Sequence, residues 1–177
     1  MIRLLGMVGC LALGLALLAP MSAGASAGTT STAVLRPASP DVVPARKLVQ
    51  RAMEDQILEL TNAERTSNGC RALKPSKKLR KAARRHTVAM SVAGVMSHQL
   101  PGEAKFSTRI TRAGYRGWTL VAENIARGFS SPESVMTAWM NSPSHRKNIL
   151  NCRLRDLGVG VVLHDDQLWW TQDFGTR

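Results

Sequence analysis

The chain has 177 residues, enough for one domain with additional segments, and it carries 24 Lys and Arg against 12 Asp and Glu. The formal net charge of +12 favours anionic partners. Aromatic residues make up only 5% of the chain and no nucleic-acid-binding signature occurs, so we expect no nucleic-acid partner.

Residues 1–27 have the pattern of a secretory signal peptide. Arg3 supplies a positive charge, residues 4–18 are apolar, and small residues follow as far as Ala27. The apolar run is short for a membrane span, and the small residues after it favour cleavage. We therefore expect a secreted, extracellular protein.

Residues 28–46 contain three prolines and no helical period, which is typical of a flexible linker. The folded domain is expected over residues 47–177. Cleavage of the signal peptide would remove Cys10 and leave Cys70 and Cys152, which are 82 positions apart. An even pair in an exported chain predicts a disulfide, and neither cysteine has the surroundings of a catalytic thiol.

The first half of the domain has helical periodicity. Apolar residues at spacings of three and four predict a first helix that ends near Asn68-Gly69. Pro75-Ser76 opens a second helix that runs to about Ala93. The buried stripe expected for this helix consists of Leu79, Ala82, Ala83, His86 and Met90.

The outer face of the second helix is basic. Between positions 74 and 85 there are seven cations and no acid: Lys74, Lys77, Lys78, Arg80, Lys81, Arg84 and Arg85. In an exported protein this basic surface either contacts an anionic cell-envelope polymer or a membrane surface, or it is a solvated face that aids solubility. The sequence leaves both interpretations open.

The pattern changes towards the C-terminus. Ser107 is expected to cap a short helix that ends at Gly114, and Ser131 and Ser142, each followed by proline, open two more helices. Residues 157–163 and 167–174 predict two strands joined by a polar turn. Trp169 and Trp170 must face opposite sides of their strand, so one is expected in the core and the other is a candidate stacking surface. Helices followed by a hairpin predict an α+β fold.

Short motifs in a fixed order give the chain a family resemblance. They are Asn62-Ala63-Glu64-Arg65, Ser97-His98, Ala122-Glu123-Asn124-Ile125-Ala126, Ser142-Pro143-Ser144-His145-Arg146 and Gly158-Val159-Gly160. From Val49 to Gly175 the chain resembles the CAP superfamily (SCP domains), which includes cysteine-rich secretory proteins, antigen 5 and pathogenesis-related 1 proteins. It is most similar to the bacterial secreted branch. The resemblance implies an α-β-α sandwich with a small antiparallel sheet between helices.

The resemblance also implies a cavity where two histidines and acidic residues meet, often around zinc. His98 and His145 match the histidines, Glu123 matches the acid and is the candidate catalytic base, and Asn124, Asn141 and His86 are expected to line the same cavity. Without the resemblance, the residues themselves favour a loop histidine that is hydrogen-bonded to backbone at His98, and a core histidine at His86. Arg146 favours a neutral, metal-ready ring at His145.

One departure from the family pattern bears on catalysis. The second acid of the animal and plant members falls at Asn141, and a neutral amide cannot act as a base. We therefore expect a binding module for a lipid or an anionic envelope component, monomeric, with a cleft that binds a divalent cation, rather than an enzyme. The alternative is an extracellular hydrolase that is metal-assisted or uses Glu123.

Overall fold

The computed structural model describes residues 42–177. The predicted signal peptide and linker residues 28–41 lie outside this range. Helix α1 (Val42–Ser67) begins inside the segment expected to be linker, with Pro44 in its first turn, where a backbone N–H has no intrahelical partner. Within residues 42–177, no helix is both long and apolar enough to cross a membrane.

Five helices and four strands make up the described part of the chain. The other helices are α2 (Lys77–Ala93), α3 (Phe106–Arg112), α4 (Pro132–Asn141) and α5 (Pro143–Ile149). The strands are β1 (Lys74–Pro75), β2 (Leu120–Arg127), β3 (Asp156–His164) and β4 (Gln167–Thr176). The α+β class is confirmed.

Local sequence explains most of the helix ends. The Ser76 side chain accepts a hydrogen bond from the Leu79 N–H at the start of α2, and Gly94 ends this helix in the left-handed conformation. Ser131 and Ser134 form a capping box at the start of α4. The cap expected at Ser107 is wrong, because α3 begins at Phe106 and its N-cap is Lys105, two residues before Ser107.

The sheet has the order β1-β3-β4-β2, with β3 antiparallel to β4, β4 antiparallel to β2, and the short β1 parallel to β3. Strand β2 was not among the predicted strands, because polar Glu123 and Asn124 interrupt its apolar residues. The register places Glu123 opposite Asp173 and Asn124 opposite Gln172. Each pair therefore shares one face of the sheet.

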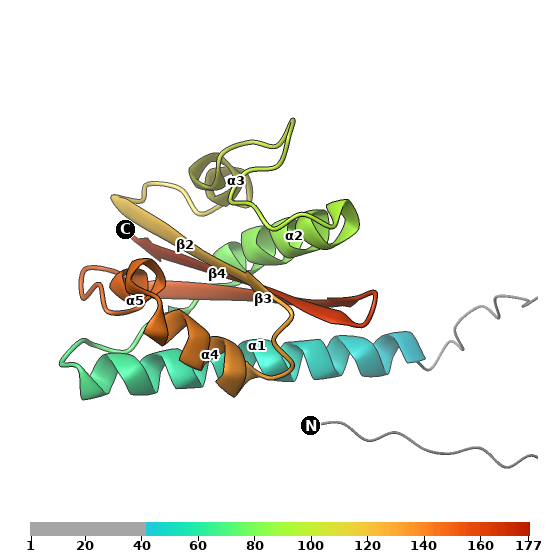
Figure 1. Cartoon of the computed structure of the whole chain (residues 1–177). Coiled ribbons are helices and arrows are strands. Elements are labelled where there is room, and N and C mark those ends of the chain that lie inside the picture. The colour runs from blue at the N-terminus through green and yellow to red at the C-terminus, as the bar shows by residue number, and fades with distance from the viewer. Residues whose placement is uncertain (1–41) are drawn as a thin grey trace, which may run out of the picture. The chain divides into compact units, whose positions relative to one another are not determined.

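Helices cover both faces of the sheet (Figure 1). Helix α2 lies directly on β3, since a Cβ added at Gly158 would come within 2.0 Å of the Arg80 backbone nitrogen. On the other face, Val159 and Val161 pack in one core with Ile57 of α1 and Trp139 of α4. The predicted α-β-α arrangement is therefore present.

Both neighbouring tryptophans of β4 are buried. Trp169 packs with Met90 of α2, and Trp170 packs with Trp139 of α4. The expected exposed stacking surface at this pair is therefore wrong, because each face of the strand has its own helical cover.

Candidate functional site

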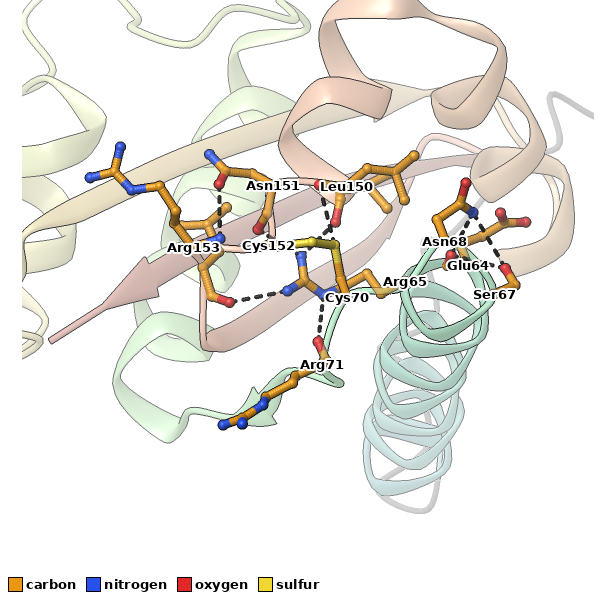
Figure 2. The surroundings of a disulfide bond; sticks show 12 residues. Glu64, Arg65, Ser67, Asn68, Cys70, Arg71, Leu150, Asn151, Cys152 and Arg153 are labelled. Atoms are coloured by element: carbon orange, nitrogen blue, oxygen red, sulfur yellow. Dashed lines mark hydrogen bonds between the residues drawn. A yellow bond between two sulfur atoms is a disulfide. The ribbon is translucent and has the colours of Figure 1, made fainter.

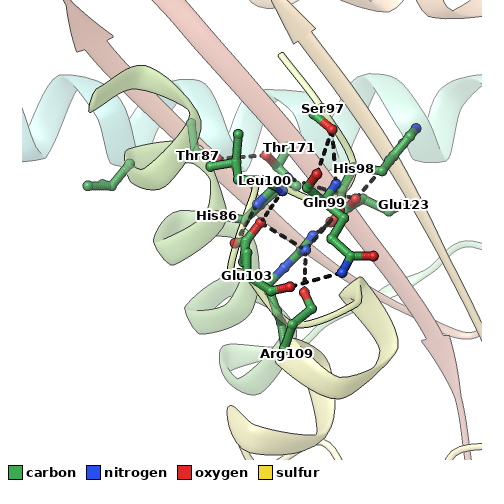
Figure 3. A network of polar contacts seen from close by, with 12 residues as sticks. His86, Thr87, Ser97, His98, Gln99, Leu100, Glu103, Arg109, Glu123 and Thr171 are labelled. Atoms are coloured by element: carbon green, nitrogen blue, oxygen red, sulfur yellow. Dashed lines mark hydrogen bonds and ion pairs between the residues drawn. The ribbon is translucent and has the colours of Figure 1, made fainter. Parts of the chain in front are cut away.

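Glu123 of β2 lies at the centre of a polar network between α2, α3 and the loop that joins them (Figure 3). Its carboxylate is buried. One oxygen, Oε1, is 2.8 Å from Nδ1 of His98, and the other, Oε2, accepts a hydrogen bond from the Arg109 guanidinium. Both oxygens of this carboxylate are therefore engaged.

His98 lies in the loop after α2, and its side chain is 54% exposed. A carboxylate at Nδ1 favours the tautomer with the proton on that nitrogen, which leaves the lone pair of Nε2 free. The Arg109 guanidinium also donates to the His98 carbonyl oxygen, at 2.8 Å. Arg109 therefore holds both the loop and the carboxylate that orients the ring.

His145 is brought to the same region by α5. The Asn124 side chain donates to the His145 carbonyl oxygen at 3.2 Å and accepts from Asn148 at 2.9 Å, which ties α5 to β2. Burial, and secondly the positive charge of His98, lower the pKa of His145. The ring of His145 is therefore held in its neutral form close enough to His98 to sense its charge.

His86 is a buried member of the α2 stripe and also faces this network. Its Nδ1 is 2.9 Å from Oε1 of Glu103, and its Nε2 is 4.0 Å from Oε1 of Glu123. That Nε2 has no hydrogen-bond partner among the residues that the structure describes. His86 thus has the core position expected for it and lies next to Glu123 as well.

Asp173 is a second acid that the sequence analysis missed. It is buried on β4 directly opposite Glu123. Burial, and secondly the charge of Glu123, raise the pKa of Asp173 well above its usual range. The sequence showed only an aspartate inside a predicted strand. Its position next to Glu123 follows from the pairing of β4 with β2, and β2 was not predicted.

Asn141 is the last residue of α4. It is exposed at the end of α4 and lines a hollow of about 350 Å³ together with Arg146 and Lys147. The buried residues of α4 are Pro132, Val135, Met136 and Trp139, and a residue two positions after Trp139 points to a different side of the helix. The cavity-lining role expected for Asn141 stays a prediction.

The network holds acids and histidines but is not a ready cluster of metal ligands. In the part of the chain from residue 42 to residue 177, no group of three or more His, Cys, Asp or Glu side chains is arranged to hold a metal ion. Glu123 is occupied by His98 and Arg109, so the candidate donors that remain are the imidazoles of His98, His145 and the buried His86.

The basic surface of α2 is smaller than its sequence implies. Arg84 binds the buried Glu54 through two hydrogen bonds, and Arg80 pairs with Asp55 and Glu54 of α1. The five remaining cations are exposed and form no ion pair within residues 42–177: Lys74, Lys77, Lys78, Lys81 and Arg85.

The predicted disulfide joins Cys70 and Cys152 (Figure 2). Beside it, the buried Arg65 guanidinium donates to the backbone carbonyl oxygens of Arg71, Ile149, Asn151 and Leu154. The end of α1, the segment between α1 and β1, and the loop after α5 are thus fastened at one place, next to the end of α5, the helix that carries His145.

Comparison with known proteins identifies the family. The model of the CAP family, described as the cysteine-rich secretory protein family, matches residues 58–174, and the chain belongs to this family. The chain is 39% identical over 123 residues to the protein YkwD of Bacillus subtilis (strain 168), a match that covers 70% of this chain and 47% of that protein.

Two solved structures extend the comparison. An extracellular protein containing an SCP domain from Bacillus anthracis str. Ames superposes with a TM-score of 0.71 at 30% identity, over 80% of this chain and 45% of that one. An outer surface protein from Borrelia burgdorferi shares the fold, with a TM-score of 0.64 at 22% identity, over 68% of this chain and 90% of that one. The chain spans about half the length of the two Bacillus proteins.

Proposed function

We propose that this chain is a secreted CAP-domain binding module whose cleft binds a divalent cation, zinc by preference, through His98 and His145. The observation that carries the proposal is the 2.8 Å contact between His98 Nδ1 and the buried Glu123 carboxylate. Histidines that bind metals commonly donate their other ring N–H to a carboxylate, which fixes the ring and frees the second nitrogen. The neutral state of His145 fits the same role.

The engagement of Glu123 supports binding over hydrolysis. A general base needs a carboxylate oxygen that reaches the proton of the attacking water. Here Oε1 faces His98 and Oε2 faces Arg109, so Glu123 acts on the histidine rather than on water. When bound, the cation supplies a positive charge to which an anionic ligand can coordinate.

The partner class that we propose is an anionic component of the cell envelope. The expected signal peptide and the extracellular SCP-domain relative favour a location outside the cell. Lys74 of β1 and the four exposed cations of α2 give the domain a positive outer face, and none of the five forms an ion pair within residues 42–177. Attraction through this face is expected to weaken as salt is added.

Zinc titration by calorimetry tests the cation site. We expect His98→Ala with His145→Ala to abolish binding, and Glu123→Gln to weaken it by about 10- to 100-fold because the His98 ring loses its charged partner. His164→Ala, at the β3–β4 turn, is the matched control and is expected to bind like the unaltered protein.

Equal zinc affinity in the double variant and the unaltered protein would contradict the proposed site. The hydrolase alternative is tested by incubation with a broad panel of peptides and peptidoglycan. Turnover that disappears in Glu123→Gln would favour the enzyme over the binding module.

A further inference from the structure

Exposed aliphatic side chains lie on the last turns of α2 and on the first half of α1, where Val88 and Leu48 line one hollow. Val92 is 70% exposed and Leu48 is 69% exposed, and Val88, one turn before Val92, is also exposed. Figure 1 shows the end of α2, the first half of α1 and the β3–β4 turn on the same side of the molecule. A cluster of this kind, unlike scattered single residues, marks an interaction surface.

Two apolar hollows flank α1 at this end. The first, of about 550 Å³, is lined by Leu48 of α1, Val88 of α2, and Val161 and Val162 of β3. The second, of about 440 Å³, lies between α1 and the β3–β4 hairpin and includes Val49 and Leu163. Both fall in the size range of about 300–1,000 Å³ that is usual for ligand sites.

All charged residues that line the two hollows are cations. They are Arg46, Lys47, Arg51 and Arg84. Arg84 is bound to Glu54, whereas Arg46 and Lys47 are exposed and form no ion pair within residues 42–177. Asp165 and Asp166 of the β3–β4 turn line neither hollow.

The outer face of α2 continues the same pattern. Lys81, Arg85, Val88 and Val92 follow one another at spacings of three and four, so they lie on one side of the helix. This side is cationic in its first part and aliphatic in its last part. The combination suits an anionic bilayer, which offers phosphate headgroups to cations and an acyl boundary to aliphatic side chains.

We propose that this end of the molecule, defined by Leu48, Val88, Val92 and the cation Lys47, docks on the surface of an anionic lipid bilayer. The inference rests on the proposed function and names the anionic envelope component as lipid. A soluble anionic polymer would need only the cations, and it would leave the exposed aliphatic side chains without a partner. The bilayer accounts for both.

Sedimentation with lipid vesicles tests the proposal, using protein purified from the medium of an expressing bacterium so that any signal peptide has been processed. We expect binding to phosphatidylglycerol vesicles and not to phosphatidylcholine vesicles. Leu48→Asn with Val92→Asn is expected to weaken binding at least tenfold, because both side chains leave the acyl boundary. Lys47→Gln is expected to weaken it about fivefold, while the remote Lys147→Gln on α5 is the matched control.

Hydrogen exchange gives a second readout that needs no variant. On phosphatidylglycerol vesicles, exchange is expected to slow in residues 45–51 and 86–96 and to stay unchanged in α4. Equal binding by the Asn double variant would overturn the proposal. Equal binding to neutral vesicles, binding of dispersed fatty acid without vesicle binding, or binding of polyphosphate alone would also overturn it.

The vesicle-binding test and the zinc titration can fail independently of each other. Zinc affinity is expected to be unchanged in Leu48→Asn with Val92→Asn. If the unaltered protein binds zinc but not phosphatidylglycerol vesicles, the bilayer proposal alone is removed. If it binds these vesicles but not zinc, the cation site alone is removed.

Discussion

At the scale of single residues, the paired carboxyls Asp173 and Glu123 govern the site. Because burial and the charge of Glu123 raise the pKa of Asp173, its ionisation opposes folding. The unfolded carboxyl titrates near pH ~3.9, so the stability lost at Asp173 grows as the pH rises above that value. Arg109 and His98 contact the two oxygens of Glu123, which lies opposite Asp173 in the sheet.

Asp173→Asn removes this ionisation and keeps a hydrogen-bond donor. We expect its melting temperature at pH 7 to exceed that of the unaltered protein by about 3 °C or more, and the difference to vanish as the pH falls towards ~4. Thermal unfolding followed by circular dichroism across this pH range measures the effect. Asp166→Asn, which alters an exposed aspartate in the β3–β4 turn, is the control. A melting temperature of Asp173→Asn that is lower than that of the unaltered protein by the same amount at every pH would contradict the raised pKa of Asp173.

At the scale of elements, the packing of α2 on β3 sets the position of the site. The absence of side chains at Gly158 and Gly160 lets α2 approach the strand closely enough to place His86 beside Glu123. A Cβ at Gly158 would meet the backbone of Arg80, which cannot move without shifting the helix.

Gly158→Ala is therefore expected to lower the free energy of unfolding by about 3 kcal/mol or more, the upper range for overpacking a rigid contact. Gly102→Ala is the comparison, because Gly102 has a positive φ but open space around it, and a loss of about 1 kcal/mol is expected there. Urea unfolding of the two variants measures the contrast. If both variants lost the same free energy of unfolding, α2 would be able to move away from β3 at little cost, contrary to this prediction.

At the scale of the whole molecule, the disulfide closes a loop of 82 residues that contains α2, α3, β2, α4 and α5. The chain-entropy estimate for such a loop is about 4.5 kcal/mol, and measured values are typically about 2–4 kcal/mol. Cys70→Ser with Cys152→Ser is expected to lower the melting temperature by about 10 °C. Dithiothreitol should lower the melting temperature of the unaltered protein to a similar extent and leave the double variant unchanged.

Much of the architecture was predictable from local sequence. Helix caps such as Ser76 and Ser131, the Gly94 terminator and the alternating strands act over a few residues, so their pattern was visible in the chain. The cysteine pair was predictable because cleavage of the expected signal peptide would leave two cysteines, which have one possible pairing. The family motifs supplied the α-β-α arrangement, which periodicity alone did not.

The sequence by itself determined the class of the fold, the disulfide and the identity of His98, Glu123 and His145 as candidates. Only the tertiary structure decided that Asp173 lies opposite Glu123, that Asn141 is exposed at the end of α4, and that Arg80 and Arg84 are neutralised by α1. These facts depend on strand register and on contacts between segments far apart in the chain. Local composition and spacing carry no information about which distant residues will meet.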